Sequence, residues 1–246
     1  MSFQKAADLI KNSSYMIAFT GAGISTPSGI PDFRSPSTGL WNLIDPSEIP
    51  TLTKFKIDPE SFYINFKSLV TNILKAEPNP AHYALVQFEK LGLLNSIITQ
   101  NIDMLHQKSG SKTVIELHGT LKTATCIKCY KKVKLINKLK TFLKDNKIPI
   151  CEKCGSYLKP DIILFEEQLP YEAWQHAKED IANCDLLLVI GSSLETFPAA
   201  HLPYEAITSG ANMIMINKSE TYINTDINVF IKNDASIILP QILALI

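Results

Sequence analysis

Four cysteines have the spacing of a metal site. Cys126 and Cys129 form one C-x-x-C pair, and Cys151 and Cys154 form a second pair after 21 intervening residues. Two such pairs can surround one Zn²⁺ tetrahedrally with every ligand position filled, as in structural rather than catalytic zinc sites. Two disulfides would need an oxidising compartment, and redox-active pairs would not explain two copies. We therefore predict one structural zinc ion.

A glycine-rich stretch, TGAGISTPSGIPDFRS at 20–35, follows the apolar run YMIAF. It begins like a dinucleotide-binding turn, yet Thr26 stands where the G-x-G-x-x-G pattern has its third glycine. Gly21 and Gly23 would let the backbone approach a nucleotide, and N–H groups at a helix start could bind its phosphates. A simple phosphate loop does not require the Ile-Pro-Asp-Phe-Arg tail that follows Gly29. We therefore predict a nucleotide site that does more than bind phosphate.

Polar residues follow four predicted strands, which is where α/β sheets bind ligands. Each residue alone could be a cap or a turn residue, but four such positions in one chain indicate a shared site. The residues are Asn101, Ile102 and Asp103, then His118, then Gly191, Ser192 and Ser193, and finally Asn217. Histidine suits proton transfer near neutral pH, because its unperturbed pKa is about 6.5. We expect His82, His106, His176 and His201 to be structural.

The elements that must position these residues alternate along the chain. Apolar runs rich in Ile and Val predict strands at 15–20, 96–101, 113–117, 161–165, 185–191 and 212–217. Such runs suit strands buried on both faces, and amphipathic helices separate most of them. We therefore predict an α/β fold with a doubly wound parallel sheet.

Two helices can be placed from their ends or their apolar stripes. Asn79 and Pro80 give an N-cap and a first-turn proline, and Gly92 ends that helix. The other helix carries an apolar stripe that we assign to core packing rather than to cofactor contact. The stripe consists of Phe62, Phe66, Leu69, Val70 and Ile73.

Composition fits one globular unit with a small inserted lobe, since 46% of the 246 residues are hydrophobic and 20% are charged. No apolar run approaches the roughly 20 residues that span a bilayer, so we expect a cytoplasmic protein without a membrane partner. Residues 122–159 carry eleven lysines against two carboxylates, a charge of +9, and the rest of the neutral chain carries −9. We interpret this segment as a solvated surface, because a nucleic-acid site would need aromatic residues interleaved as a stacking platform.

The motifs together resemble those of the sirtuin family of NAD-dependent protein deacylases. In family order, the chain carries GAGIS with SGIPDFR, TQNID, HG, the two C-x-x-C pairs, KPDIILF, GSSL with PAA, and IN. The resemblance implies a Rossmann-like sheet with a small lobe made of a zinc ribbon and a helical insertion. It implies a Rossmann-like NAD-binding domain (1–34, 79–120 and 160–246), a helical insertion with the cofactor loop (35–78), and a zinc-binding module (121–159). NAD and substrate would meet in the cleft between the lobes.

The resemblance also implies which residues bind NAD. They are Gly21, Ala22, Gly23, Thr26, Asp32, Phe33, Arg34, Gln100, Asn101, Ile102, Asp103, His118, Gly191, Ser192, Ser193, Asn217 and Ala235. The tail after Gly29 then has a role, because a glycosidic cleavage has to shield a sugar cation from water, whereas hydride transfer does not. Phe33 would guard the reactive ribose carbon. Arg34, the only arginine of the chain, would support the cofactor and its loop.

In a sirtuin-like reaction, the acyl-lysine carbonyl oxygen attacks the nicotinamide ribose carbon as nicotinamide leaves. Asn101 and Asp103 would hold the departing amide and the ribose, and His118 would act as general base on a ribose hydroxyl. The products would be nicotinamide, free lysine and O-acyl-ADP-ribose, with acetyl as the chief acyl group. A protein ADP-ribosyltransferase or an NAD hydrolase could use the same NAD site, and a sensor could bind NAD without reaction.

The implied partner is an acylated-lysine protein or peptide, added as a strand beside Ile163, Leu164, Phe165 and Thr196. Glu166 stands where the family's phenylalanine-glycine-glutamate has its glycine, which could narrow this edge or favour basic peptides. Relatives that remove succinyl groups pair a tyrosine with an arginine three residues on. Because this chain has one arginine, already assigned to the cofactor, we expect acetyl-lysine to be preferred over succinyl-lysine.

Overall fold

The computed structural model describes residues 2–32, 39, 50–221 and 227–246. A six-stranded parallel sheet has the order β3-β2-β1-β7-β8-β9. Its strands are β1 (Met16–Thr20), β2 (Leu94–Thr99), β3 (Val114–Glu116), β7 (Leu186–Ile190), β8 (Asn212–Asn217) and β9 (Val229–Lys232). The chain runs outward from β1 in one direction and from β7 in the other. The predicted doubly wound sheet is therefore confirmed, and its switch point lies between β1 and β7, where such sheets bind ligands.

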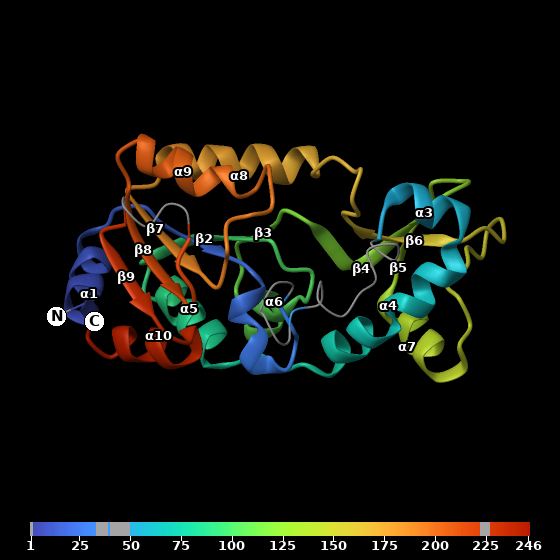
Figure 1. Cartoon of the computed structure of the whole chain (residues 1–246), viewed down its shortest axis with the longest axis horizontal. Coiled ribbons are helices and arrows are strands. Elements are labelled where there is room, and N and C mark those ends of the chain that lie inside the picture. Colours follow the sequence, from blue (N-terminus) through green and yellow to red (C-terminus); the bar gives the residue numbers. More distant parts are fainter. Residues whose placement is uncertain (1, 33–38, 40–49, 222–226) are drawn as a thin grey trace.

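Helices cover both faces of this sheet (Figure 1). One face packs against α1 (Ser2–Asn12), α5 (Pro80–Lys90) and α10 (Ala235–Leu243), and the other packs against α8 (Tyr171–Asn183) and α9 (His201–Thr208). Within β1, Ala18 belongs to the first buried cluster and Phe19 to the second, because successive side chains of a strand point to opposite faces. Burial on both faces explains the continuous apolar runs of the sequence.

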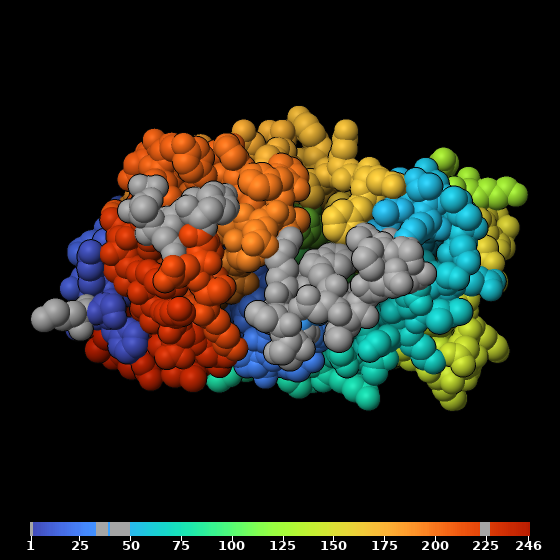
Figure 2. All heavy atoms as spheres, in the orientation of Figure 1, coloured from blue at the N-terminus to red at the C-terminus, as the bar shows by residue number. Residues whose placement is uncertain are grey.

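A small lobe lies beside this large lobe along the long axis of the molecule (Figures 1 and 2). It contains the antiparallel strands β4 (Gly119–Cys126), β5 (Lys132–Lys134) and β6 (Leu158–Ile162), in the order β5-β4-β6. Its helices are α3 (Leu52–Ile57), α4 (Pro59–Lys75) and α7 (Ile136–Asp145). A third buried cluster, including Phe55, Tyr63 and Phe142, joins these helices to the small sheet.

One strand expected in the parallel sheet belongs to the small sheet instead. The run at 161–165 overlaps β6, and β6 pairs antiparallel with β4. The burial of Leu158–Ile162 alternates residue by residue, which is typical of a strand with one exposed face rather than of a doubly buried one. This alternation begins at Leu158, upstream of the apolar run, so the apolar run alone does not reveal it.

The predicted helix ends agree with the structure. Asn79 caps α5 by accepting a hydrogen bond from Ala81 N–H (2.9 Å), and Gly92 follows the helix at a φ of +73°. The α6 helix (Leu105–Ser109) follows β2 and packs near α5. In the described parts of the chain, no helix is both long and apolar enough to cross a membrane.

Candidate active site

Three glycines let the turn after β1 pack against the turn after β7. A side-chain carbon added to Gly21 or Gly23 would lie 2.7 Å from backbone atoms of Gly191, closer than real side chains approach. Gly191 has a φ of +59°, and a side-chain carbon there would lie 2.3 Å from the backbone nitrogen of Ile24. The contact between the two turns therefore requires these glycines, a reason that the sequence did not suggest.

Asn101 and Asp103 are fixed by a buried hydrogen-bond cluster that includes Ser25. The Ser25 hydroxyl donates to Asp103 Oδ2 (2.7 Å), and Asn101 Nδ2 donates to the Gly21 carbonyl (3.1 Å) and to Ser25 Oγ (3.2 Å). Burial raises the pKa of Asp103, although hydrogen bonds from Leu105 N–H and from Ser25 act in the opposite direction. Both side chains are thus oriented before any ligand binds, which avoids reorganisation during a reaction.

His118 immediately precedes β4, and one of its ring nitrogens is hydrogen-bonded. Its Nδ1 is 2.9 Å from the carbonyl oxygen of Gln100. A carbonyl can only accept a hydrogen bond, so Nδ1 carries the proton and Nε2 keeps its lone pair. Burial lowers the pKa of His118, and the hydrogen bond to Gln100 offsets this only in part. At neutral pH the ring is therefore a neutral base with Nε2 as its accepting atom.

The ends of β2, β7 and β8 are tied to one another through Ser192. Gln100 Nε2 donates to Ser192 Oγ (2.9 Å), and Asn217 Nδ2 donates to the Ser192 carbonyl (3.0 Å). The polar residues that follow separate strands in the sequence are therefore joined at one edge of the sheet. This convergence is what the carboxyl ends of parallel strands produce.

Every predicted site residue in the described chain, apart from the zinc cysteines, lines one cavity of about 1610 Å³. The predicted NAD residues on its wall are Gly21, Ala22, Gly23, Thr26, Asp32, Gln100, Asn101, Ile102, Asp103, His118, Gly191, Ser192, Ser193, Asn217 and Ala235. The predicted substrate residues on its wall are Ile163, Leu164, Phe165 and Thr196. Phe33 and Arg34 lie outside the described residues, so their roles stay predictions.

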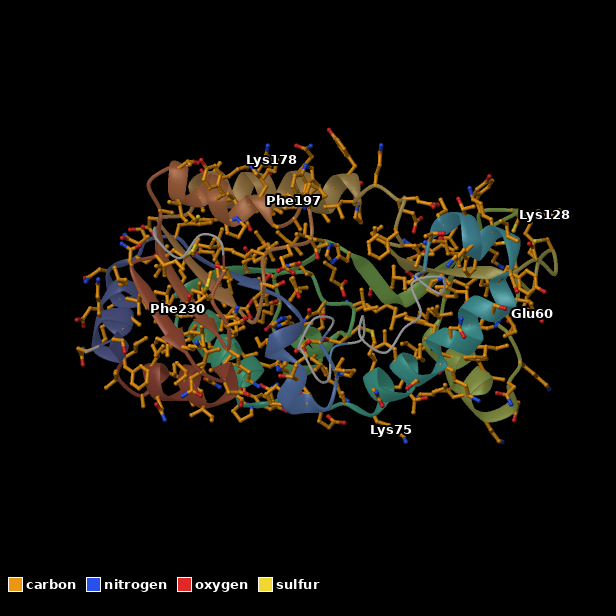
Figure 3. All side chains as sticks on the ribbon, in the orientation of Figure 1. Glu60, Lys75, Lys128, Lys178, Phe197 and Phe230 are labelled. Carbon is orange, nitrogen blue, oxygen red and sulfur yellow. The ribbon has the colours of Figure 1, made fainter. Side chains whose placement is uncertain are left out.

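The predicted peptide segment lies beside the predicted base. The backbone N–H of Ile163 donates to the carbonyl of His118 (2.9 Å). Two exposed aromatic side chains line the cavity, namely Phe165, which is 51% exposed, and Phe197, which is 65% exposed and is labelled in Figure 3. Exposed apolar surface of this kind in a cavity is suited to contact with a ligand chain.

Sequence reasoning missed some residues of the cavity and gave others too narrow a role. Ser25 belongs to the GAGIS motif, and the motif alone does not indicate that its hydroxyl contacts both Asn101 and Asp103. The α4 stripe does pack in the small-lobe core, as predicted, but four of its members also line the cavity. These are Phe62, Phe66, Leu69 and Ile73. Their spacing could not distinguish core contact from cavity wall, because both need the same apolar face.

The four predicted zinc ligands gather at one point of the small lobe. Their sulfur atoms all lie within 4.8 Å of one another, with 3.4 Å between Cys126 and Cys154 and 3.6 Å between Cys129 and Cys151. Tetrahedral Zn–S bonds of about 2.3 Å place the sulfurs about 3.8 Å apart, so the cluster fits a single zinc ion with no open position. Lys128, from the lysine-rich segment, lies at the outer end of this lobe (Figure 3).

Comparison with known proteins gives consistent matches over nearly the whole chain. The sequence matches the Sir2 family over residues 21–198. It is 43% identical to an NAD-dependent protein deacylase of Archaeoglobus fulgidus, covering 97% of this chain and 94% of that protein. It is 44% identical to an NAD-dependent protein deacetylase of Caldanaerobacter subterraneus subsp. tengcongensis, covering 99% and 96%. A solved structure of Sir2 with a p53 peptide and NAD⁺ is similar at a TM-score of 0.89 and 37% identity, covering 99% and 98%.

Proposed function

This chain belongs to the Sir2, or sirtuin, family, and we propose from that membership and from its cavity that it removes acyl groups from protein lysines with consumption of NAD⁺. It is an NAD-dependent protein deacylase, as its curated relatives are. Its partners are acylated-lysine peptides or proteins, in line with the peptide held by a similar structure. Bound NAD⁺ supplies the ribose that accepts the acyl group, with nicotinamide as the leaving group.

The observation that carries the role of His118 is its hydrogen bond to the Gln100 carbonyl. This contact fixes the tautomer, so that Nε2 is the nitrogen that takes a proton from a ribose hydroxyl. Because burial lowers its pKa, His118 is neutral and ready to accept that proton at pH 7. His118 also lines the same cavity as the predicted NAD and peptide residues, which brings the base within reach of both.

Asn101 and Asp103 position the reactants in this proposal. The Asn101 amide is held by the Gly21 carbonyl and by Ser25, and the Asp103 carboxyl is held by Ser25 and Leu105. A side chain that already has a fixed orientation can hold the nicotinamide amide or the ribose at little entropic cost. Ser25 joins the two residues and thereby becomes part of the proposed site.

The division of the chain follows the same proposal. Residues 1–34, 79–120 and 160–246 make the NAD-binding domain, 35–78 the helical insertion and cofactor loop, and 121–159 the zinc-binding module. Strands β4 and β6 extend a few residues beyond that module at each end. A cytoplasmic location is part of the proposal as well, supported by the fit of four cysteine thiolates to zinc rather than to disulfides.

Incubation of the purified protein with NAD⁺ and an acetyl-lysine peptide, followed by mass analysis of the products, tests this function. We expect deacetylated peptide, nicotinamide and O-acetyl-ADP-ribose. An ADP-ribosylated peptide would instead indicate a transferase. ADP-ribose with unchanged peptide would indicate an NAD hydrolase, and no turnover would indicate a binding protein.

A further inference from the structure

The segment after β6 makes a tight turn at an unusual residue. The N–H of Glu167 donates to the carbonyl of Leu164 (3.1 Å), and Glu166, the third residue of this turn, has a φ of +75°. Glycine normally fills such a position, because a side chain in the left-handed region is strained. A glutamate that persists there calls for a compensating contact.

The carboxylate of Glu166 makes that contact with α3 of the helical insertion. Glu166 Oε2 accepts hydrogen bonds from Thr53 N–H (2.9 Å) and from the Thr53 hydroxyl (2.7 Å). These bonds, led by the Thr53 hydroxyl, lower the pKa of Glu166, so the carboxylate stays charged at neutral pH. Charge-assisted hydrogen bonds of this kind are stronger than those between neutral groups.

Backbone hydrogen bonds beside Glu166 add to the contact between this turn and the start of α3. Phe165 N–H donates to the Pro50 carbonyl (3.1 Å), and Leu52 N–H donates to the Phe165 carbonyl (3.0 Å). Two of the first N–H groups of α3 are thus satisfied by the turn after β6, and the third is satisfied by the Thr51 hydroxyl. Hydrogen bonds therefore join the Leu164–Glu167 turn to the helical insertion, although the two segments are over a hundred residues apart in the chain.

We propose that Glu166 is a positioning residue for the acyl-peptide substrate. Its two hydrogen bonds to Thr53, called the clasp below, hold the Leu164–Glu167 turn in the conformation that receives the peptide strand. This proposal rests on the proposed deacylase function. Leu164, Phe165 and Glu166 all line the cavity, so the clasp lies at the predicted peptide edge. An edge that is ordered in advance lowers the entropic cost of adding a strand.

The neighbouring carboxylate does not duplicate this role. Glu167 Oε2 accepts from Lys159 Nζ (2.8 Å) and from Leu164 N–H (2.8 Å), so these bonds stabilise the turn internally and do not reach α3. Among the hydrogen bonds described between this turn and α3, those of Glu166 are the ones that a side-chain change can remove. The effect of the Glu166 charge can be separated from the effect of its hydrogen bonds to Thr53. A substitution of Thr53 removes the bond from the Thr53 hydroxyl and leaves the charge of Glu166 in place.

Steady-state kinetics of the full-length protein on an acetyl-lysine peptide test the proposal with Glu166→Gly, Glu166→Gln and Thr53→Val. We expect Glu166→Gly to raise KM for the peptide about 3- to 10-fold, with kcat and KM for NAD⁺ within about twofold of wild type. Its melting temperature should not fall, because glycine relieves the positive φ. Thr53→Val should raise the peptide KM by about 2- to 3-fold, but should add nothing in the Glu166→Gly background. Glu166→Gln keeps an acceptor oxygen and should be intermediate.

A matched control lies at the N-terminus of α10, where Asp234 is the N-cap residue. Asp234 accepts from Ser236 N–H (2.9 Å) and from the Ser236 hydroxyl (2.7 Å) in the same pattern, so Ser236→Ala should leave the peptide KM unchanged. A peptide KM within twofold of wild type in Glu166→Gly, or effects of Glu166→Gly and Thr53→Val that simply add, would overturn the proposal while the wild-type enzyme deacylates normally. A wild-type protein that does not deacylate would overturn the proposed function first, and this inference with it.

Discussion

At the scale of single residues, the proton state of His118 is set by burial and by one main-chain carbonyl. Burial moves the pKa of His118 below the ordinary value of about 6.5, and the base works only when neutral. Activity should therefore be retained as the pH falls from 7.5 to 6.5 and be lost only at lower pH. The pH profile of kcat/KM on an acetyl-lysine peptide measures this. An acidic limb centred above pH 6.5 would show that the ring is not held in the neutral form described.

The choice of acyl group also depends on single side chains. Lys54 and Lys218 are the cations on the described cavity wall, and Lys218 is paired with Asp234 (2.9 Å). Lys67, a possible substitute for the absent arginine, instead donates to the Asn146 side chain and lies over the ring of Phe142. Without an arginine guanidinium to pair with it, a succinyl carboxylate buried in the cavity would lose its hydration and gain no hydrogen-bond partner in return.

We therefore predict that kcat/KM for an acetyl-lysine peptide exceeds that for the succinyl-lysine peptide of identical sequence by at least about tenfold, a preference of about 1.4 kcal/mol. Competition between the two peptides in one reaction gives the ratio directly. Equal values would point to a cation that reaches the acyl group, with Lys54 as the first residue to replace.

At the scale of elements, the zinc cluster and the cavity share one core. Cys126 and Cys151 are buried with Phe142 of α7 and with Phe62 and Ile73 of α4, and the last two also line the cavity. Tyr63 of the same helix donates its hydroxyl to the Leu158 carbonyl of β6 (2.6 Å). Loss of the metal should thus disturb the helical wall of the site, although the metal takes no part in the reaction.

We expect Cys151→Ser to remove stoichiometric zinc, lower the melting temperature by about 10 °C or more, and reduce activity in parallel. Metal analysis and thermal unfolding of the same preparation measure the first two effects. Cys184→Ser is the matched control, because Cys184 is buried in a different cluster at the C-terminal end of α8. Fully active wild-type protein without zinc would contradict the assignment.

Two buried histidines join α5 to α6 and should make the fold sensitive to acid. His82 and His106 have ring centroids 5.0 Å apart, and burial lowers the pKa of His82 to about 4. His82 Nδ1 accepts from Asn79 N–H (3.3 Å), a bond that a protonated ring cannot accept. The unfolded chain takes up this proton near pH 6.5 and the folded chain only near pH 4, so stability is complete above about pH 6.5 and falls toward pH 4.

The shift of His82 corresponds to about 3 kcal/mol lost across that range. Urea unfolding at pH 7.5 and at pH 5 should show a smaller loss of stability in His82→Gln than in the wild type. His201→Gln, which changes a surface histidine beside Glu205, is the control and should lose as much as the wild type. An identical loss in wild type and His82→Gln would mean that His82 does not carry the acid sensitivity.

At the scale of the whole molecule, the sequence predicts best what the sheet itself imposes. Apolar runs buried on both faces identify the parallel strands, and the strand-end residues Asn101, His118 and Asn217 converge because parallel strands end at one edge. The cysteine pairs are predictable for a similar reason, since metal geometry fixes their spacing.

Contacts between segments far apart in the chain could not be predicted in this way. The bonds of Ser25 to Asp103 and of Glu166 to Thr53 depend on which loops meet after folding, and no local pattern marks them. The packing of Gly21 and Gly23 on Gly191 is a contact of this kind as well. The sequence therefore explains these glycines only by the approach of a ligand, and not by the contact between the two turns. The strand β6 was misplaced because its apolar end resembles a doubly buried strand.

The central claim is that His118 Nε2 is the base of an NAD-dependent deacylation in the cavity between the lobes. Its most direct test compares wild type, His118→Ala and the surface control His176→Ala on NAD⁺ and an acetyl-lysine peptide, with products resolved by mass. We predict one nicotinamide and one O-acetyl-ADP-ribose for each lysine freed by wild type and by His176→Ala. We predict a fall in turnover of about 10²- to 10⁴-fold in His118→Ala, with NAD⁺ binding retained. More than about a tenth of wild-type turnover in His118→Ala would contradict the account.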